Sequence, residues 1–318
     1  MKEINITRND SGQRTDKFLL KYFDKAGKGF IYKMLRKKRI KLNGGRSDGT
    51  EMLNEGDTIQ LYLSDDTMES FMEKKTIEKS VISFETVYED ENILAVNKPA
   101  GVLSHPESKG DKDTLIDQIL TYLIEKGEYS PDKEKSFTPA LCNRLDRNTS
   151  GIVIAGKNAE TLRQANKAVK DKKIRKLYSA FVAGTKTEGG RLEDFYSKDG
   201  SINKASLGSG DKKIITKYRP LKTDGSYTVM EVELITGKSH QIRLHMASID
   251  CPIIGDIKYG NEKENRKFRQ LAGVKRQLLH AGKMILGGFE GDLEYLNGKT
   301  IVAELPEDFK KAEKSVFR

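Results

Sequence analysis

The sequence predicts an α+β protein with two domains, the larger of which holds a mixed, mainly antiparallel sheet. The chain has 318 residues, which is long enough for two domains. A polar, weakly patterned stretch at residues 64–80 is interpreted as a linker between a short N-terminal zone, 1–63, and a large zone, 81–318. In the large zone, strand patterns outnumber helix patterns and rarely alternate with them one for one. This favours an antiparallel α+β sheet over a doubly wound one.

The N-terminal zone is expected to form a compact module of two helices and a small sheet. Residues 14–23 carry an apolar helical stripe, and residues 30–38 form a second, shorter helix whose basic residues lie on its outer side. Residues 40–44 are expected to be a strand that enters a turn. Residues 58–63 alternate between apolar and polar side chains, as a strand does.

The large zone is expected to consist mostly of strands. Helices are expected at 114–125, where Thr114 can cap the N-terminus, and at 159–170. The clearest strand patterns lie at residues 93–97, 152–155, 178–183, 227–234 and 240–244.

Positive charge is concentrated in one part of the N-terminal zone. The chain has a net charge of +10, and from Lys25 to Arg46 there are nine basic residues and no acidic one. A stretch of one sign and this length is a candidate surface for a polyanion, although a solvated lysine-rich helix face explains it equally well. The candidate binding residues there are Lys33, Arg36, Lys37, Lys38, Arg39 and Lys41. Two further basic stretches, 163–176 and 258–283, are expected to contact phosphates.

Other features of the sequence argue against several classes of protein. Two cysteines, Cys142 and Cys251, are too few for a disulfide framework or a structural zinc site. The first residues contain no apolar run, and no segment approaches the length of a membrane span, so a cytoplasmic protein without membrane contact is expected. His240 and His245 are five residues apart on an expected strand. They would face opposite sides, so no shared metal ion is expected.

One short segment carries the strongest chemical signal. Asp146 stands between Arg144 and Arg147, just ahead of a Thr-Ser-Gly turn and a buried strand. Neighbouring guanidinium groups favour the ionised form of a carboxylate, which suits a nucleophile or a base better than a proton donor. From these residues alone, a structural Asp-Arg pair that caps a turn is the favoured interpretation.

The segment Arg-Leu-Asp-Arg-x-Thr-Ser-Gly resembles the signature of the pseudouridine synthase family that modifies ribosomal large-subunit RNA. Residues 89–101 resemble the opening motif of that family, 176–178 its lysine-x-tyrosine strand, and 236–245, continuing to Tyr259, its closing motif. The order and spacing agree from residue 85 to about 306. The N-terminal module resembles the S4 RNA-binding fold. One departure is Asn143, where the family often has histidine.

The resemblance implies a catalytic domain with a central cleft and a role for each matching residue. Asp146 would be the essential acid, which either attacks the anomeric carbon of the ribose or removes the 2′ proton. Tyr178 would stack on the target base and help to remove the C5 proton, and Arg243 would pair with Asp146. Arg144 would enter the space that the extruded nucleotide leaves. Lys176 and His240 would also bind the substrate.

The resemblance also implies the partners of the protein. The substrate would be large-subunit ribosomal RNA, and the protein a monomer. The reaction exchanges one bond for another within a nucleotide, so no cofactor or metal is expected. The main rival interpretation is a non-catalytic RNA-binding or ribosome-assembly factor. The joint presence of Asp146, Tyr178 and Arg243 argues against it, since a scaffold needs none of them.

Overall fold

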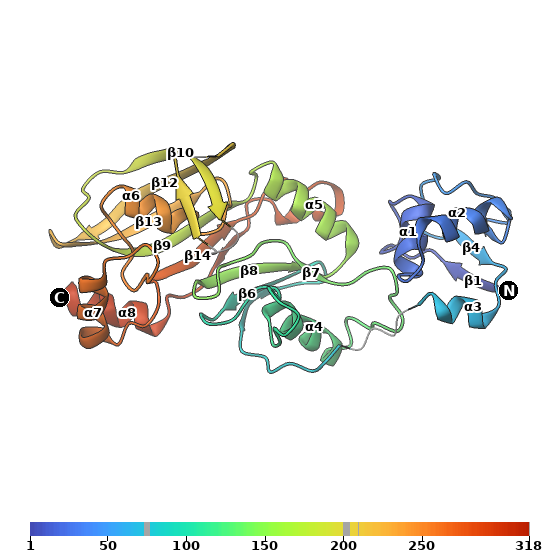
Figure 1. Cartoon of the computed structure of the whole chain (residues 1–318), viewed down its shortest axis with the longest axis horizontal. Helices are drawn as coiled ribbons and strands as arrows, with labels where there is room; N and C mark the ends of the chain where they lie inside the picture. The colour runs from blue at the N-terminus through green and yellow to red at the C-terminus, as the bar shows by residue number, and fades with distance from the viewer. Residues whose placement is uncertain (73–76, 200–203, 209, 318) are drawn as a thin grey trace. The chain divides into compact units, whose positions relative to one another are not determined.

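A computed structural model of the chain describes residues 1–72, 77–199, 204–208 and 210–317 (Figure 1). The chain divides into two compact units. The first unit comprises Met1–Ile82, Asp117–Ala140 and Gly156–Arg163, and the second comprises Ser83–Ile116, Leu141–Ala155 and Gln164–Arg318.

The N-terminal part of the first unit is a small α/β module, and both expected helices and both expected strands are present. Its four strands form an antiparallel sheet in the order β1-β4-β2-β3. Apolar side chains from the helices and strands, among them Phe18, Ile31 and Ile59, form one fully buried core. The elements are β1 (Lys2–Asn5), α1 (Thr15–Tyr22), α2 (Lys28–Arg36), β2 (Ile40–Leu42), β3 (Gly45–Arg46), β4 (Thr58–Leu61) and α3 (Asp65–Ser70).

The segment expected to be a linker contains a helix. Ser64 caps α3, because its hydroxyl accepts a hydrogen bond from the Thr67 N–H at 3.4 Å. Met68 of α3 is buried in the core of the N-terminal module, and Phe71 and Met72 pack against that core. Residues 65–72 therefore extend the module beyond the expected boundary. Residues 73–76 of the expected linker lie outside the described part of the chain.

The rest of the chain is built around a large mixed sheet (Figure 1). Its strand order is β11-β10-β12-β13-β9-β14-β8-β6-β5, with β15 paired to β14 and β7 paired to β8. The run from β11 to β14 is antiparallel, whereas β14 and β8 are parallel. The expected mixed, mainly antiparallel α+β fold is confirmed.

The strands of this sheet are β5 (Glu85–Glu89), β6 (Ile93–Lys98), β7 (Ala140–Leu141), β8 (Ser150–Gly156), β9 (Arg175–Ala183), β10 (Gly190–Asp199), β11 (Lys204–Leu207), β12 (Lys212–Thr223), β13 (Tyr227–Leu234), β14 (Leu279–Ile285) and β15 (Thr300–Val302). The helices are α4 (Leu115–Glu125), α5 (Ala159–Lys170), α6 (Gln241–Ser248), α7 (Glu262–Ala272), the 3-10 turn η1 (Gly291–Leu296) and α8 (Glu307–Val316).

The prediction of a strand at 240–244 is wrong, because α6 occupies this segment. The helix begins directly after His240, whose backbone is left-handed with φ of 59°. Every residue from Gln241 to Met246 is buried, so the helix shows no polar face. A short helix that is buried over most of its length has no periodicity that separates it from a strand, and the alternation in His-Gln-Ile-Arg-Leu was misleading.

Candidate active site

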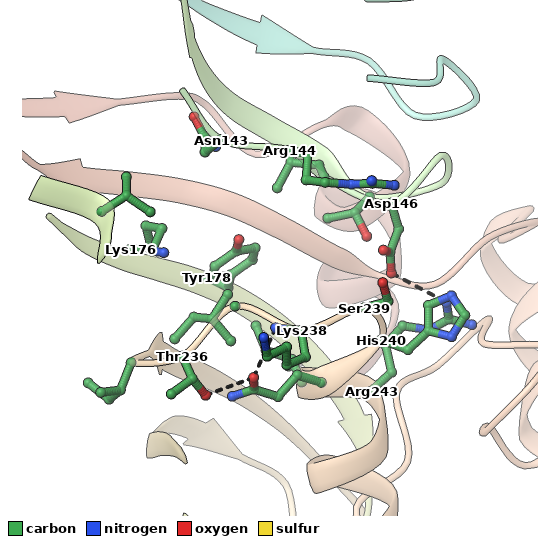
Figure 2. Close-up of a pocket in the computed structure, with 18 of the residues that line it drawn as sticks. Asn143, Arg144, Asp146, Lys176, Tyr178, Thr236, Lys238, Ser239, His240 and Arg243 are labelled. Atoms are coloured by element: carbon green, nitrogen blue, oxygen red, sulfur yellow. Dashed lines mark hydrogen bonds and ion pairs between the residues drawn. The ribbon is translucent and has the colours of Figure 1, made fainter. Parts of the chain in front are cut away.

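A pocket of about 650 Å³ lies within the second unit (Figure 2). Its walls come from the loop at 142–149, from β9, and from the segment at 234–243 that joins β13 to α6. Asp146 is the only acidic residue among the described residues that line it. Eight basic residues line it as well: Arg144, Lys170, Lys172, Lys176, Lys212, Lys213, Lys238 and Arg243. A concave site with one carboxylate and many cations suits a polyanion whose reacting part contacts the carboxylate.

Asp146 lies in a tight turn between β7 and β8. The Thr149 N–H donates to the Asp146 carbonyl at 3.0 Å, which closes the turn. The carboxylate is 28% exposed, so it faces the pocket and solvent as well as protein. Gly151 follows with φ of 119°, and an added Cβ there would lie 2.4 Å from the Ala281 carbonyl oxygen. The glycine therefore lets β8 run closely beside β14 directly after the turn.

Arg243 contacts Asp146, but its main partner is a different acid. One guanidinium nitrogen, Nη1, lies 3.5 Å from Asp146 Oδ2. Nε and Nη2 form a short fork to Asp256 at 2.6 and 2.7 Å, and both of these side chains are almost fully buried. The Arg243 guanidinium, together with the Lys258 and Tyr259 N–H groups, holds the pKa of Asp256 below its ordinary value although burial acts to raise it. The expected pairing of Arg243 with Asp146 is present as a longer contact.

Tyr178 and Lys176 line the same pocket from β9. Because side chains two residues apart on a strand lie on one face, both point toward the cavity (Figure 2). Tyr178 is buried, and burial, with a smaller contribution from the Asp146 charge, raises the pKa of its phenol. Burial lowers the pKa of Lys176.

Comparison with known proteins identifies the family of this chain. Residues 92–248 match the family model for RNA pseudouridylate synthase. The chain is 35% identical to a ribosomal large subunit pseudouridine synthase D of Borreliella burgdorferi, over 72% of this chain and 68% of that protein. It is 32% identical to a ribosomal large subunit pseudouridine synthase C of Rickettsia bellii, over 94% and 96%. The chain belongs to the RNA pseudouridine synthase family.

The fold of this synthase also resembles solved structures. The human RNA pseudouridylate synthase domain containing 4 protein superposes with a TM-score of 0.56 at 22% sequence identity, covering 73% of this chain and 92% of that one. At this identity the likeness concerns the fold. Membership in this family supports an isomerase. It therefore favours an enzyme over the non-catalytic RNA-binding factor that was the rival interpretation of the sequence.

His240 and Arg144 of the synthase lie at different depths in the pocket. His240 Nδ1 is 3.0 Å from the Tyr259 hydroxyl, and burial, opposed by the Asp146 charge, lowers the pKa of the imidazole. Arg144 is 65% exposed and lies 3.7 Å from Glu107, an ion pair that solvent screens strongly. The substituted family position, Asn143, forms hydrogen bonds to two main-chain groups of β8, the Ile152 carbonyl at 3.2 Å and the Ile154 N–H at 2.9 Å.

The six basic residues expected to bind RNA belong to α2 and the segment that follows it in the first unit. Arg36, Lys37, Lys38 and Arg39 are exposed, as is Lys33, whereas Lys41 is half-buried with its ammonium 5.2 Å from the centre of the Tyr62 ring. Within the described residues none of the six takes part in an ion pair, so their charge is available for a ligand.

Two features are absent from the described residues. No group of three or more histidine, cysteine, aspartate or glutamate side chains is arranged to hold a metal ion there. None of the described helices combines the length and the apolar character needed to span a membrane.

Sequence reasoning missed three residues that shape the site. Asp256 holds Arg243, as described above. Lys98 is fully buried, and its ammonium donates to the carbonyls of Pro99, Val102 and Arg147 at 2.8, 2.7 and 3.1 Å. Arg276 donates to the Asn148 carbonyl at 3.3 Å. Lys98 and Asp256 stand in the opening and closing motifs, so the signal that could have identified them was a charged residue inside an apolar segment.

Proposed function

We propose that this enzyme converts specific uridines of large-subunit ribosomal RNA to pseudouridine, and that Asp146 is the reacting carboxylate. The observation that carries the proposal is the pocket itself. The one acid among the described residues that line it is partly exposed on a turn, lies beside the Arg243 guanidinium, and is surrounded by cations suited to RNA phosphates. The names of the relatives support large-subunit RNA as the substrate.

The target uridine would have to leave its helix to reach Asp146. C1′ and C5 of a stacked nucleotide are inaccessible to a side chain at the bottom of a pocket, so extrusion must precede the chemistry. Arg144, which is 65% exposed and makes only a 3.7 Å ion pair to Glu107, would enter the vacated space. The bond between N1 and C1′ then breaks, the base turns, and a bond forms between C5 and C1′ while the C5 proton is lost and N1 gains one. Asp146 acts by attack on C1′ or by removal of the 2′ proton.

Lys176 is proposed to hold the far edge of the base. Its ammonium is mostly buried, and within the described residues it has neither a hydrogen bond nor an ion pair. A buried cation without a partner gains free energy from an incoming acceptor. With Tyr178 against the ring face, Lys176 would donate to the O4 oxygen of uracil. Cytosine carries an amino group at that position and would be rejected.

The N-terminal module is proposed to be an S4-like RNA-binding domain. The unpaired cations of α2 and the segment after it would contact phosphates and so supply affinity and register, and the pocket would select the base. The domain boundary proposed for RNA binding lies after Met72, because the module core includes Met68 and packs against Phe71 and Met72.

Release of tritium from RNA labelled at C5 of uridine tests the proposal. The wild-type enzyme should release tritium from large-subunit RNA fragments, and Asp146→Asn should release none while its affinity for RNA stays within a few-fold. Mapping of pseudouridines in ribosomal RNA from cells with and without the protein then identifies the sites. Near-normal turnover by Asp146→Asn would refute the assigned role, and an unchanged pseudouridine map would refute the substrate.

A further inference from the structure

The turn that bears Asp146 is held at each of its carbonyl groups. The Ser104 hydroxyl donates to the Leu145 carbonyl at 2.9 Å and accepts from the Leu145 N–H at 3.1 Å. The Gly101 N–H and the Lys98 ammonium both donate to the Arg147 carbonyl, at 2.8 and 3.1 Å. The next carbonyl, that of Asn148, accepts from Arg276. Hydrogen-bond partners from segments distant in the sequence therefore fix the position and orientation of the turn.

Arg276 is itself fixed by the C-terminal helix. Its Nε and Nη2 form a fork to the two carboxylate oxygens of Asp308 in α8, both at 2.7 Å. The remaining nitrogen, Nη1, is thereby aimed at the Asn148 carbonyl at 3.3 Å and at the Gln277 carbonyl at 3.2 Å. The Arg276 side chain is only 11% exposed, so solvent does little to weaken this arrangement.

The main chain of Arg276 also contacts the support of Arg243. Gly255 has φ of 81°, and an added Cβ there would lie 1.9 Å from the Arg276 carbonyl oxygen. Gly255 directly precedes Asp256, the acid that holds Arg243. One residue therefore packs against the turns that position both Asp146 and its guanidinium neighbour.

We propose that Arg276 is a positioning residue for the isomerisation, and that Asp308 acts through it to make α8 part of the support of the Asp146 turn. This inference rests on the proposed role of Asp146. Arg276 touches neither the pocket nor the substrate in this role; it sets the place of the carboxylate through the Asn148 carbonyl. Small misplacements of a reacting group reduce rates strongly, which makes such support visible in turnover.

Lys98 provides a readout that a purely structural role would leave unchanged. Its ammonium donates to three carbonyls, which requires the protonated amine, so loss of the proton should loosen the Asp146 turn. The charged groups that face it are Arg276 and Asp146. Burial, with the Arg276 charge in second place, lowers the pKa of Lys98 to about 7, and Asp146 opposes the shift. Turnover should fall as the pH rises past this value, and removal of the Arg276 charge should move the fall to higher pH.

The experiment compares Arg276→Met, Arg276→Lys and Asp308→Asn with Arg219→Met. The control removes an arginine of similar length that pairs with Glu231 at 2.9 Å on the exposed surface of β12. Single-turnover tritium release between pH 6 and 8.5, RNA affinity and melting temperature are measured for each. We expect Arg276→Met to slow release about 100-fold at pH 7, to bind RNA like the wild type, and to lose activity at higher pH than the wild type. Arg276→Lys keeps the charge and should keep the wild-type pH midpoint. Arg219→Met should change nothing.

Two results would overturn the inference. The first is a wild-type rate in Arg276→Met. The second is a slower rate with an unshifted pH midpoint, which would show a general loss of structure. If Arg276→Met does not fold, Asp308→Asn is the deciding variant, because it keeps the arginine and breaks only its fork to the carboxylate. Asp308→Asn should slow tritium release without raising the pH midpoint, and a wild-type rate in this variant would refute the inference. A wild-type protein that releases no tritium would refute the proposed function instead, and this inference with it.

Discussion

Replacing Asp256 by asparagine should cost stability, and the same replacement at Asp146 should cost only activity. The two acids share one guanidinium but differ in geometry. Asp256 forms two bonds to Arg243 at 2.6 and 2.7 Å with its side chain 1% exposed, whereas Asp146 lies 3.5 Å away and is 28% exposed. Asp256→Asn removes both short ion-pair bonds and leaves the buried guanidinium with only the long contact to Asp146, which costs about 3–5 kcal/mol of unfolding free energy. Asp146→Asn loses one long contact, worth about 1 kcal/mol or less.

Urea unfolding followed by circular dichroism measures both values, and tritium release gives the turnover of the same preparations. Both variants replace an aspartate by asparagine, which has nearly the same shape, so each variant is the control for the other. Asp256→Asn should also reduce turnover, because Arg243 loses its anchor. A stability of Asp256→Asn within about 1 kcal/mol of the wild type would show that the fork does not hold Arg243. A loss of about 3 kcal/mol or more in Asp146→Asn would show that this acid is structural.

Three other measurements test the remaining assignments. Lys176→Met should lower kcat/KM about 10- to 100-fold, which is the worth of a charge-assisted hydrogen bond. On RNA whose target base lacks O4, the same substitution should cause no further fall in kcat/KM, and an additional fall on that RNA would exclude the contact. Burial lowers the pKa of His280 from 6.5 to about 4. Between these pH values the unfolded chain binds more protons than the folded one, so the free energy of unfolding should fall by about 3 kcal/mol as the pH drops through this window. Urea titrations of His280→Gln should lack this pH-dependent loss. RNA affinity in filter binding should fall about 10³-fold between 50 and 200 mM salt if about six phosphates are neutralised. The double variant Arg36→Gln, Lys37→Gln should show a weaker dependence of affinity on salt. An affinity that does not change with salt would exclude phosphate contacts as its main source.

Local patterns were sufficient for most of the fold. The helices at 114–125 and 159–170 and the strand at 227–234 were predictable from their apolar patterns, and the strand at 93–97 from a short apolar run that stops at Lys98-Pro99. The error at 240–244 arose where burial on all sides removed the period. Helix α3 was missed because its segment is polar, and a single methionine, Met68, anchors it to the core.

The candidate site was only partly predictable, because charge pairing over long distances in the sequence leaves no local pattern. The sequence motifs place Asp146, Tyr178 and Arg243 in the chain, and the structure brings all three to one pocket. Neither the fork from Asp308 to Arg276 nor the one from Asp256 to Arg243 follows from periodicity or composition, since each depends on how helices and turns meet in three dimensions. Resemblance to a family indicated the groups proposed to react, and the structure shows which side chains support them.

The way in which the structure departs from the expected pairing has a chemical meaning. A fork from Arg243 to Asp146 would occupy both carboxylate oxygens and leave few lone pairs for a substrate. With Asp256 taking Nε and Nη2, only Nη1 remains near Asp146, at 3.5 Å. The guanidinium still lies beside the carboxylate through this one nitrogen. An acid proposed to attack a sugar carbon or to remove a proton needs free carboxylate oxygens, and a shared guanidinium leaves them free where an exclusive ion pair would not.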